Sequence, residues 1–284
     1  MLSYRHAFHA GNHADVLKHL ILVQLIRHLG QKEKPFWVID THAGAGVYDL
    51  DAARARKLAE HEGGIGRLWA RRDLPAPVAD YVDLARRLNP GGTLRKYPGS
   101  PFLALWTMRQ QDRLRLFERH GSDARLLRKN FHDAGQRVIV EDTDGFAGLR
   151  ALLPPPPRRA VALIDPSYEE KQDYERVIQA LKDALERFPG GIYAVWYPQL
   201  TRLEARQLPQ RLKRLPAKGW LHVALRVRAP AGDGFGMHGS GLVVLNPPWT
   251  LHDTLAGALP FLAEALREDA GAGFTLDRGQ RTED

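Results

Sequence analysis

Apolar positions along the chain recur with two spacings, one helical and one typical of strands. Leu17, Ile21 and Leu25 fall on one face of a helix that we expect over residues 13–29, with Asn12 as its N-cap. Short continuous runs of β-branched and aromatic residues, typical of buried strands, follow it. We expect buried strands over residues 36–40, 114–118, 138–140, 160–164 and 192–196, and a closing antiparallel pair over 221–227 and 242–245.

Helical segments separate several of these strands, and this alternation is typical of βαβ units with a parallel sheet. Residues 50–95 are rich in Arg, Ala, Leu and Glu at helical spacing and contain no convincing strand, so we expect a helical insertion there. We predict one α/β domain over residues 1–284 and a frayed C-terminal tail over 271–284. The separating helices are expected over residues 101–110, 122–132 and 171–187.

Charge and composition narrow the class of protein. The 284 residues include 41 Lys and Arg against 33 Asp and Glu, a net charge of +8, which favours a polyanionic partner such as nucleic acid. There is no cysteine, which excludes disulfides, thiolate metal sites and a cysteine nucleophile. No run reaches the roughly 18 apolar residues that a membrane-spanning helix needs, so we expect a soluble, cytoplasmic protein with no membrane partner.

A glycine turn follows the first expected strand. The segment Asp40 to Gly46 (DTHAGAG) would let backbone amides approach a nucleotide or adenosyl group, although a purely structural turn is the alternative interpretation. The third glycine of the NAD fingerprint and the lysine of a P-loop are both missing, which disfavours NAD and ATP. Glu118 ends the second strand, where a carboxylate can bind ribose hydroxyls or be merely solvated. Asp144-Gly145 could meet an adenine ring or form an ordinary turn.

The segment Asp165-Pro166-Ser167-Tyr168 follows another buried strand and carries the sharpest chemical signal. The amine of adenine is a poor nucleophile, and its protons must leave as a methyl group arrives. A rigid carboxylate and the Pro166 carbonyl can accept hydrogen bonds from those protons while an aromatic ring stacks on the base. An ordinary strand-end turn is the alternative. Asn246-Pro247-Pro248-Trp249 fits the same pattern, but it follows a late strand, away from the expected ligand crevice.

Histidines near the N terminus raise the question of a metal site. A zinc or iron site would also need a carboxylate, which Asp15 supplies only in part, so we expect no metal. Lys18 and His19 could instead point at a carboxylate or a phosphate, and Tyr4 could stack on a base. The histidines concerned are His6, His9, His13 and His19.

Together these motifs resemble the methyltransferase J family of the large ribosomal subunit, whose members methylate an adenine N6 in 23S rRNA. The resemblance implies a Rossmann-like class I fold with a seven-stranded mixed sheet and a small inserted helical subdomain. It also implies S-adenosylmethionine as methyl donor, direct in-line transfer, and a monomer that acts on protein-free rRNA or an early assembly state. The matching stretches are MLSYRHAFHAGNHADVLKH, DTHAGAG, YPGSP, the DG pair, DPSY with IYAVWYP, and SGLVVLNPPW.

The resemblance also implies roles for individual residues. Asp165 becomes the proton acceptor, Tyr4 meets the target adenosine, and His6 and Lys18 assist it. The chain departs from the family pattern at Ser167, where the family has a second proline. Residues implied to contact the cofactor are His19, His42, Ser100, Glu118, Asp144, Gly145 and Asp165.

Three other functions stay open from the sequence. A DNA adenine-N6 methyltransferase would use the same motif but is expected to carry a larger sequence-reading domain than this insertion. An RNA-binding module with impaired catalysis would be consistent with Ser167. Metal-dependent hydrolysis would use the N-terminal histidines.

Overall fold

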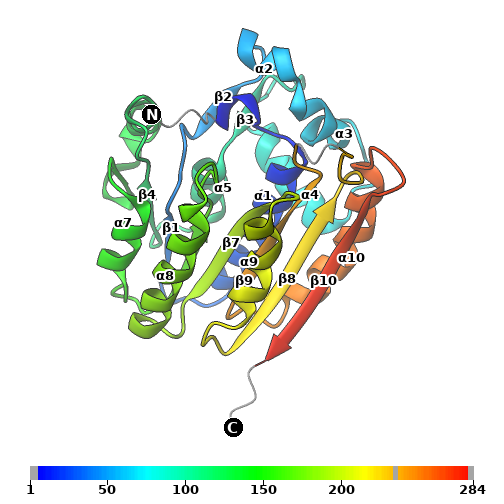
Figure 1. Cartoon of the computed structure of the whole chain (residues 1–284). Coiled ribbons are helices and arrows are strands. Elements are labelled where there is room, and N and C mark those ends of the chain that lie inside the picture. Colours follow the sequence, from blue (N-terminus) through cyan, green and yellow to red (C-terminus); the bar gives the residue numbers. More distant parts are fainter. Residues whose placement is uncertain (1–5, 233–235, 281–284) are drawn as a thin grey trace.

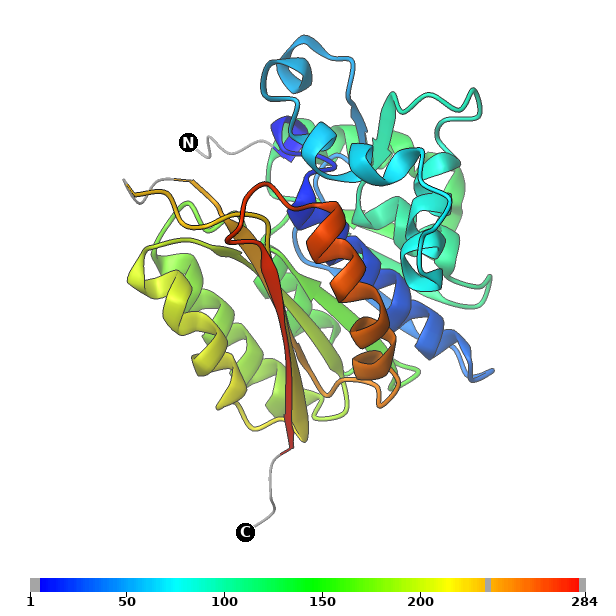
Figure 2. The ribbon, with the colours of Figure 1, turned by 90° about the vertical axis from the view of Figure 1, so that its right-hand side faces the viewer.

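The computed structural model describes residues 6–232 and 236–280, which form three layers with one sheet between two sets of helices (Figures 1 and 2). The sheet has eight strands in the order β10-β8-β9-β7-β6-β1-β4-β5. Five strands are parallel, and three antiparallel strands complete one edge. The bounds are β1 Trp37–Asp40, β4 Arg113–Phe117, β5 Val138–Glu141, β6 Ala160–Ile164, β7 Ile192–Gln199, β8 Gly219–Arg226, β9 Gly239–Leu245 and β10 Gly273–Gln280.

The sheet has one strand more than the expected seven. The extra strand lies in residues 271–284, where a frayed tail was expected. Gly273–Gln280 forms β10, which pairs antiparallel with all eight residues of β8. Without it, β8 would present a row of unpaired backbone groups to solvent. Most side chains of β10 are exposed, so its hydrophobic pattern is too weak to predict a strand. Residues 281–284 lie outside the described part.

Helices cover both faces of the sheet and enclose two apolar cores (Figure 2). The first helix, α1, is buried on nearly all sides because it packs against other helices and against strands β6, β7 and β9. Asn12 caps it as expected, accepting hydrogen bonds from the amides of Ala14 and Asp15. One face carries α1 His13–Gly30, α4 Ala76–Arg86, α5 Ser100–Thr107 and α10 Leu251–Ala265; the other carries α7 Gly145–Leu152, α8 Gln172–Arg187 and α9 Leu203–Lys213. Helix α6, Gly121–Asn130, follows β4.

The segment 50–95 is mainly helical, as expected. Helices α2 (Ala53–Leu58), α3 (Ile65–Trp69) and α4 lie in it, with a 3₁₀ turn over Glu60–Gly63. A small two-stranded sheet that the sequence did not predict closes its base, formed by β2 (Val47–Asp49) and β3 (Lys96–Pro98). The apolar side chains of α3 and α4 belong to the same core as α1, so the insertion packs on the main body.

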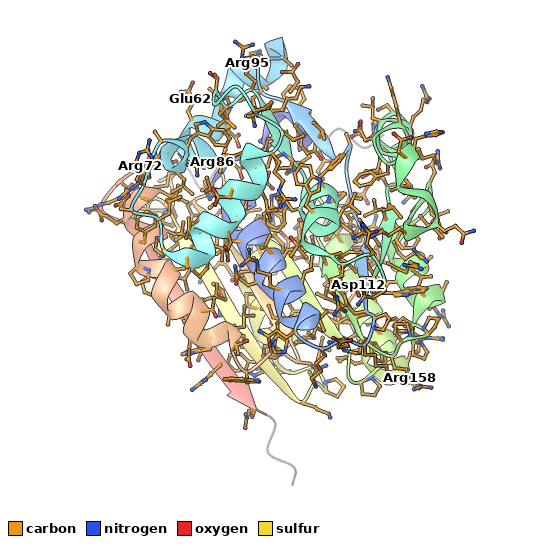
Figure 3. The ribbon with its side chains drawn as sticks, turned by 180° about the vertical axis from the view of Figure 1, so that it is seen from behind. Glu62, Arg72, Arg86, Arg95, Asp112 and Arg158 are labelled. Carbon is orange, nitrogen blue, oxygen red and sulfur yellow. The ribbon has the colours of Figure 1, made fainter. Side chains whose placement is uncertain are left out.

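The insertion lies at the end of the molecule where the parallel strands terminate (Figure 1). Seen from behind, Glu62, Arg72, Arg86 and Arg95 mark this end, whereas Asp112 and Arg158 lie towards the other end (Figure 3). Within residues 6–232 and 236–280, no helix combines the length and apolar character needed to cross a membrane.

Candidate active site

A cavity opens at the carboxyl ends of β1, β4 and β6, where strand order reverses on either side of β1. This is where open parallel sheets bind their ligands. The structure brings most of the predicted site residues together around this cavity. Those that line it are His6, Lys18, His19, His42, Ser100, Glu118, Asp144, Gly145, Asp165 and Pro166.

The glycine turn after β1 and Glu118 after β4 form one side of the cavity. Gly44 has a positive φ of 62°, and its amide donates to Glu118 Oε2 at 2.7 Å. The amide of His120 donates to Glu118 Oε1, also at 2.7 Å. Burial raises the pKa of Glu118, and these two amides oppose the rise. Each carboxylate oxygen keeps a second lone pair, so Glu118 can still accept from a pair of hydroxyl groups.

Asp144 and Gly145 begin α7 beside the same turn. Asp144 caps the helix by accepting from the amides of Phe146 and Ala147, and it also pairs with Arg176. A Cβ at Gly145 would lie 1.9 Å from the carbonyl oxygen of Thr41, so only glycine allows the two backbones to approach this closely. The cap and the close approach give this pair a structural role in addition to its place in the cavity wall.

Asp40 is a buried carboxylate that the predicted set of site residues omitted, although it begins the glycine turn. Ser100 donates to its Oδ2 at 2.6 Å, and the amide of His42 donates to its Oδ1 at 3.2 Å. Burial raises the pKa of Asp40 to about 6. Ser100, expected to contact the cofactor, lines the cavity and holds the buried Asp40 behind it.

A buried cluster of charges lies on the other side, between α1 and the end of β6. Lys18 Nζ is 2.6 Å from Asp165 Oδ2 and 2.9 Å from Asp15 Oδ1, and His6 Nε2 is 2.9 Å from Asp15 Oδ2. Burial opposes the charges of Asp15 and Lys18, but the neighbouring opposite charges outweigh it. They hold the pKa of Asp15 well below its ordinary value and that of Lys18 well above. For Asp165 burial outweighs Lys18, and its pKa is raised.

Only one carboxylate oxygen of Asp165 is engaged in this cluster. Its Oδ2 accepts from Lys18, whereas its Oδ1 has no hydrogen-bond partner among the described residues. Pro166 follows directly and also lines the cavity. An anchored carboxylate with one free oxygen is suited to accept a hydrogen bond from an amine.

His19 lies deeper on α1. Its Nδ1 is 2.7 Å from the hydroxyl of Tyr97, which is in turn 2.8 Å from the hydroxyl of Tyr81. Burial lowers the pKa of His19 to about 3, so its ring is neutral at physiological pH. His42, on the opposite wall, is likewise neutral because burial lowers its pKa to about 4.

The structure does not present the ring of Tyr168, which was predicted to stack on the base, to the first cavity. Only 1% of Tyr168 is exposed; it does not line this first cavity, although it borders a second, adjoining cavity. Tyr168 has a φ of 54°. Its ring packs inward against Tyr174 and Trp196, and its hydroxyl donates to the carbonyl of Trp196 at 2.7 Å. Tyr4 lies outside the described residues.

The N-terminal histidines do not gather into a metal site. His6 pairs with Asp15, and His9 Nδ1 is 2.8 Å from Glu60 Oε1 on the insertion. His13 and His19 are buried in α1, and burial lowers the pKa of His13 to about 4. No group of three or more potential metal ligands is found within residues 6–232 and 236–280.

A second cavity adjoins the first and lies between the insertion, the carboxyl end of β7 and the segment that precedes β9. It shares His6, Lys18, Asp165, Ser167 and Trp196 with the first cavity. Its outer wall carries the cationic side chains of three arginines from different elements. These are Arg67, Arg202 and Arg228.

With this geometry established, comparisons with known proteins identify the family. Residues 33–277 match the family model described as "Ribosomal RNA large subunit methyltransferase D, RlmJ". The chain belongs to this family. The resemblance drawn from the sequence motifs is thereby confirmed.

Individual relatives of the RlmJ family cover almost the whole chain. Ribosomal RNA large subunit methyltransferase J of Haemophilus influenzae is 44% identical over 98% of both chains. The protein of the same name from Escherichia coli strain K12 is 45% identical over 96% of both. The crystal structure of protein LPL1258 from Legionella pneumophila superposes with a TM-score of 0.88 at 35% identity, covering 95% of this chain and 98% of that one.

The fold agrees with membership of the RlmJ family. The sheet is the Rossmann-like sheet of class I methyltransferases, with parallel strands on both sides of β1 and an antiparallel edge, and β10 is an addition to the expected seven strands. The sequence analysis missed the central place of Asp15 and the cavity position of Trp196. Asp15, Lys18 and His19 do carry a signal, since ionisable residues on the buried part of a largely apolar helix need polar partners.

Proposed function

We propose that the protein transfers a methyl group from S-adenosylmethionine to the N6 amine of an adenine in 23S rRNA. The observation that carries this proposal is the carboxylate of Asp165, anchored through Oδ2 by Lys18 with Oδ1 unpartnered among the described residues. It stands beside a glycine-turn cavity of the kind that holds an adenosyl group. Membership of the RlmJ family supports ribosomal RNA as the substrate class.

The residues around the glycine turn fit S-adenosylmethionine. Glu118 is preorganised by two backbone amides and can accept from the ribose hydroxyls. His42 and the Asp144-Gly145 turn offer planar and backbone surfaces for the adenine ring, and Ser100, which donates to Asp40, would face the methionine end. When bound, the donor would supply a methyl group already activated on a sulfonium.

In the proposed step, the target adenine places its N6 amine against Asp165. Oδ1 of Asp165 and the carbonyl of Pro166 accept its two N–H groups, which turns the nitrogen lone pair towards the methyl group. As the N–C bond forms and the S–C bond breaks, nitrogen becomes acidic and loses a proton to Asp165. The products are N6-methyladenosine and S-adenosylhomocysteine.

Lys18 acts on Asp165 rather than on the base. A lone buried carboxylate beside Asp40 would take up a proton and lose its capacity to accept from the amine. Lys18 opposes this by pairing with Asp165 at 2.6 Å, and Asp15 in turn holds Lys18 in place. This pairing lowers the pKa of Asp165 against the rise that burial causes, which favours the ionised form where the amine must bind.

The second cavity gives a route for the RNA chain. It opens directly onto Asp165, and its outer arginines can contact phosphates next to an extruded nucleotide. The substrate is proposed to be protein-free rRNA or an early assembly state. RNA affinity should fall steeply with salt because phosphate contacts release counterions.

Radiolabelled methyl transfer to 23S rRNA, followed by nucleoside analysis, tests the proposal. Wild-type protein should give N6-methyladenosine, and Asp165→Ala should lower the rate by about 10²- to 10⁴-fold while its calorimetric S-adenosylmethionine affinity changes little. Equimolar duplex DNA, added as a competing acceptor, addresses the DNA alternative. A different methylated nucleoside, or preferential labelling of DNA, would contradict the proposal.

A further inference from the structure

The aromatic residue of the DPSY segment, Tyr168, does not supply the stacking surface that the proposed step needs. An adenine bound at Asp165 needs a flat apolar surface to hold its ring, but the ring of Tyr168 is buried behind the cavity wall. The ring points inward, where it packs against Tyr174 and Trp196. The hydroxyl of Tyr168 also donates to a backbone carbonyl, so swinging the ring outward would break that bond.

Trp196 is positioned to take the stacking role that the sequence predicted for Tyr168. It stands on β7 immediately after Val195, the register partner of Ile164, and Ile164 immediately precedes Asp165 on β6. Trp196 is partly exposed and lines both cavities. Its indole therefore stands next to the Asp165 carboxylate, where the two cavities join.

The contacts of Trp196 hold the ring in this position. The ring of Tyr168 packs against the ring of Trp196, with the two centroids 6.1 Å apart. Lys18 Nζ lies 5.7 Å from the centroid of the Trp196 ring while it binds Asp165. The buried indole Nε1 has no hydrogen-bond partner among the described residues, which is uncommon for a buried tryptophan.

We propose that Trp196 provides the surface against which the target adenine lies, and that Tyr168 supports Trp196 from behind. This inference rests on the proposed function. Other rings at the first cavity are committed elsewhere: His6 pairs with Asp15, His42 packs edge-on against Phe146, and Tyr48 is buried beneath His6. Within residues 6–232 and 236–280, Trp196 is the large ring that combines partial exposure with a place beside Asp165.

Three variants separate the ring face from the rest of the residue. Trp196→Leu removes the aromatic face, Trp196→Phe keeps it, and Trp249→Leu is the matched control. Trp249 is 81% exposed and follows β9 at its opposite end, outside both cavities. The readouts are kcat and KM with rRNA, calorimetric affinity for S-adenosylmethionine, and thermal unfolding.

We expect Trp196→Leu to lower kcat/KM for rRNA by roughly 5- to 150-fold, the range that loss of one base-stacking contact produces. Trp196→Phe should stay within a few fold of wild type, Trp249→Leu should match it, and all three should bind S-adenosylmethionine normally. Wild-type kcat/KM in Trp196→Leu would overturn the inference. So would equal losses in the Leu and Phe variants.

A measurement on the wild-type protein covers the case in which Trp196→Leu does not fold. Hydroxyl-radical oxidation of each tryptophan is followed by mass spectrometry with and without rRNA, in the presence of S-adenosylhomocysteine. Bound rRNA should protect Trp196 several-fold and leave Trp249 unchanged. Equal oxidation of Trp196 in both samples would overturn the inference. Neither result alters the identity of the methylated nucleoside, so a failure here is distinct from a failure of the proposed function.

Discussion

Two turns of the chain share one sequence pattern and do different work. Asp165-Pro166-Ser167-Tyr168 follows β6, and Asn246-Pro247-Pro248-Trp249 follows β9. In the first turn the polar residue faces a cavity and the aromatic ring is buried. In the second turn the polar residue forms hydrogen bonds with backbone groups and the aromatic ring is exposed.

The neighbours of each turn explain this difference. Asn246 receives a hydrogen bond from the amide of Lys218, and its own amide donates to the carbonyls of Pro189 and Gly191, so it ties three loops together. Asp165 instead meets Lys18 from α1 and keeps one oxygen without a partner among the described residues. A short motif thus acquires chemistry from its position in the sheet and from the partner brought to it.

The largest effect should come from removing the cation at the first turn. Asp15 and Asp165 hold the pKa of Lys18 well above its ordinary value despite burial. Lys18→Met therefore leaves the buried Asp165 without its cation and Asp15 with His6 as its remaining ionic partner. We expect methyl transfer to fall by at least about 100-fold and unfolding free energy to fall by roughly 3–5 kcal/mol. Activity assays and urea unfolding measure the two effects.

Lys218→Met is the matched control at the second turn, because the Lys218 side chain is exposed and only its backbone amide bonds to Asn246. It should leave both quantities within experimental error of wild type. Near-normal methyl transfer by Lys18→Met would show that Asp165 does not need its cation.

An intermediate effect, on stability alone, is expected at the second turn. Asn246→Ala removes three hydrogen bonds and places alanine at a φ of 53°, so unfolding free energy should fall by about 2–4 kcal/mol. Asn246→Gly loses the same bonds without the backbone strain and should be the milder variant. The folded fraction of each should methylate rRNA at the wild-type rate. A catalytic defect in that fraction would contradict the assignment of this turn to structure.

The sequence predicted the parts of the fold that depend on local pattern. The strand over 160–164 and the helix over 172–187 match closely, because buried apolar runs and helical spacing mark them clearly. The edge strand β10 was missed because its stability comes from pairing with β8 rather than from its own side chains. The antiparallel pair of β2 and β3 was missed for the same reason, since it joins residues on either side of the insertion.

The site was predictable to the extent that motifs lie at strand ends. Glu118, Asp144 and Asp165 were found this way, and the structure places all three around one cavity. The pairing of Lys18 with Asp165 joins residues 147 positions apart and depends on the packing of α1 against β6. Tyr168 is buried and has a positive φ, and neither property could be predicted from the residue type at this position.

The smallest effect should be a gain in the free energy of unfolding when Asp40, next to the first cavity, is replaced by Asn. Burial raises the pKa of Asp40 from its ordinary value of 3.8 to about 6, so ionisation of Asp40 destabilises the folded state. The stability that protonated Asp40 supplies is complete below about pH 3.8 and is lost as the pH rises through 6. Asp40→Asn keeps a hydrogen-bonding group and cannot ionise. It should exceed wild type by about 1–3 kcal/mol at pH 8, and the gap should close towards pH 4.

Urea unfolding at pH 4, 6 and 8 follows this difference, with Asn246→Ala measured in parallel. The deficit of Asn246→Ala should not follow the pH dependence of the Asp40 difference, because no ionisable side chain is replaced at the second turn. A reduced S-adenosylmethionine affinity in the stabilised Asp40→Asn variant would mean that the wild-type protein keeps this destabilising carboxylate for binding. An Asp40→Asn variant that is less stable than wild type at pH 8 would instead show that the bonds from Ser100 and His42 outweigh the cost of burial, and the two turns would then differ in chemistry but not in stability.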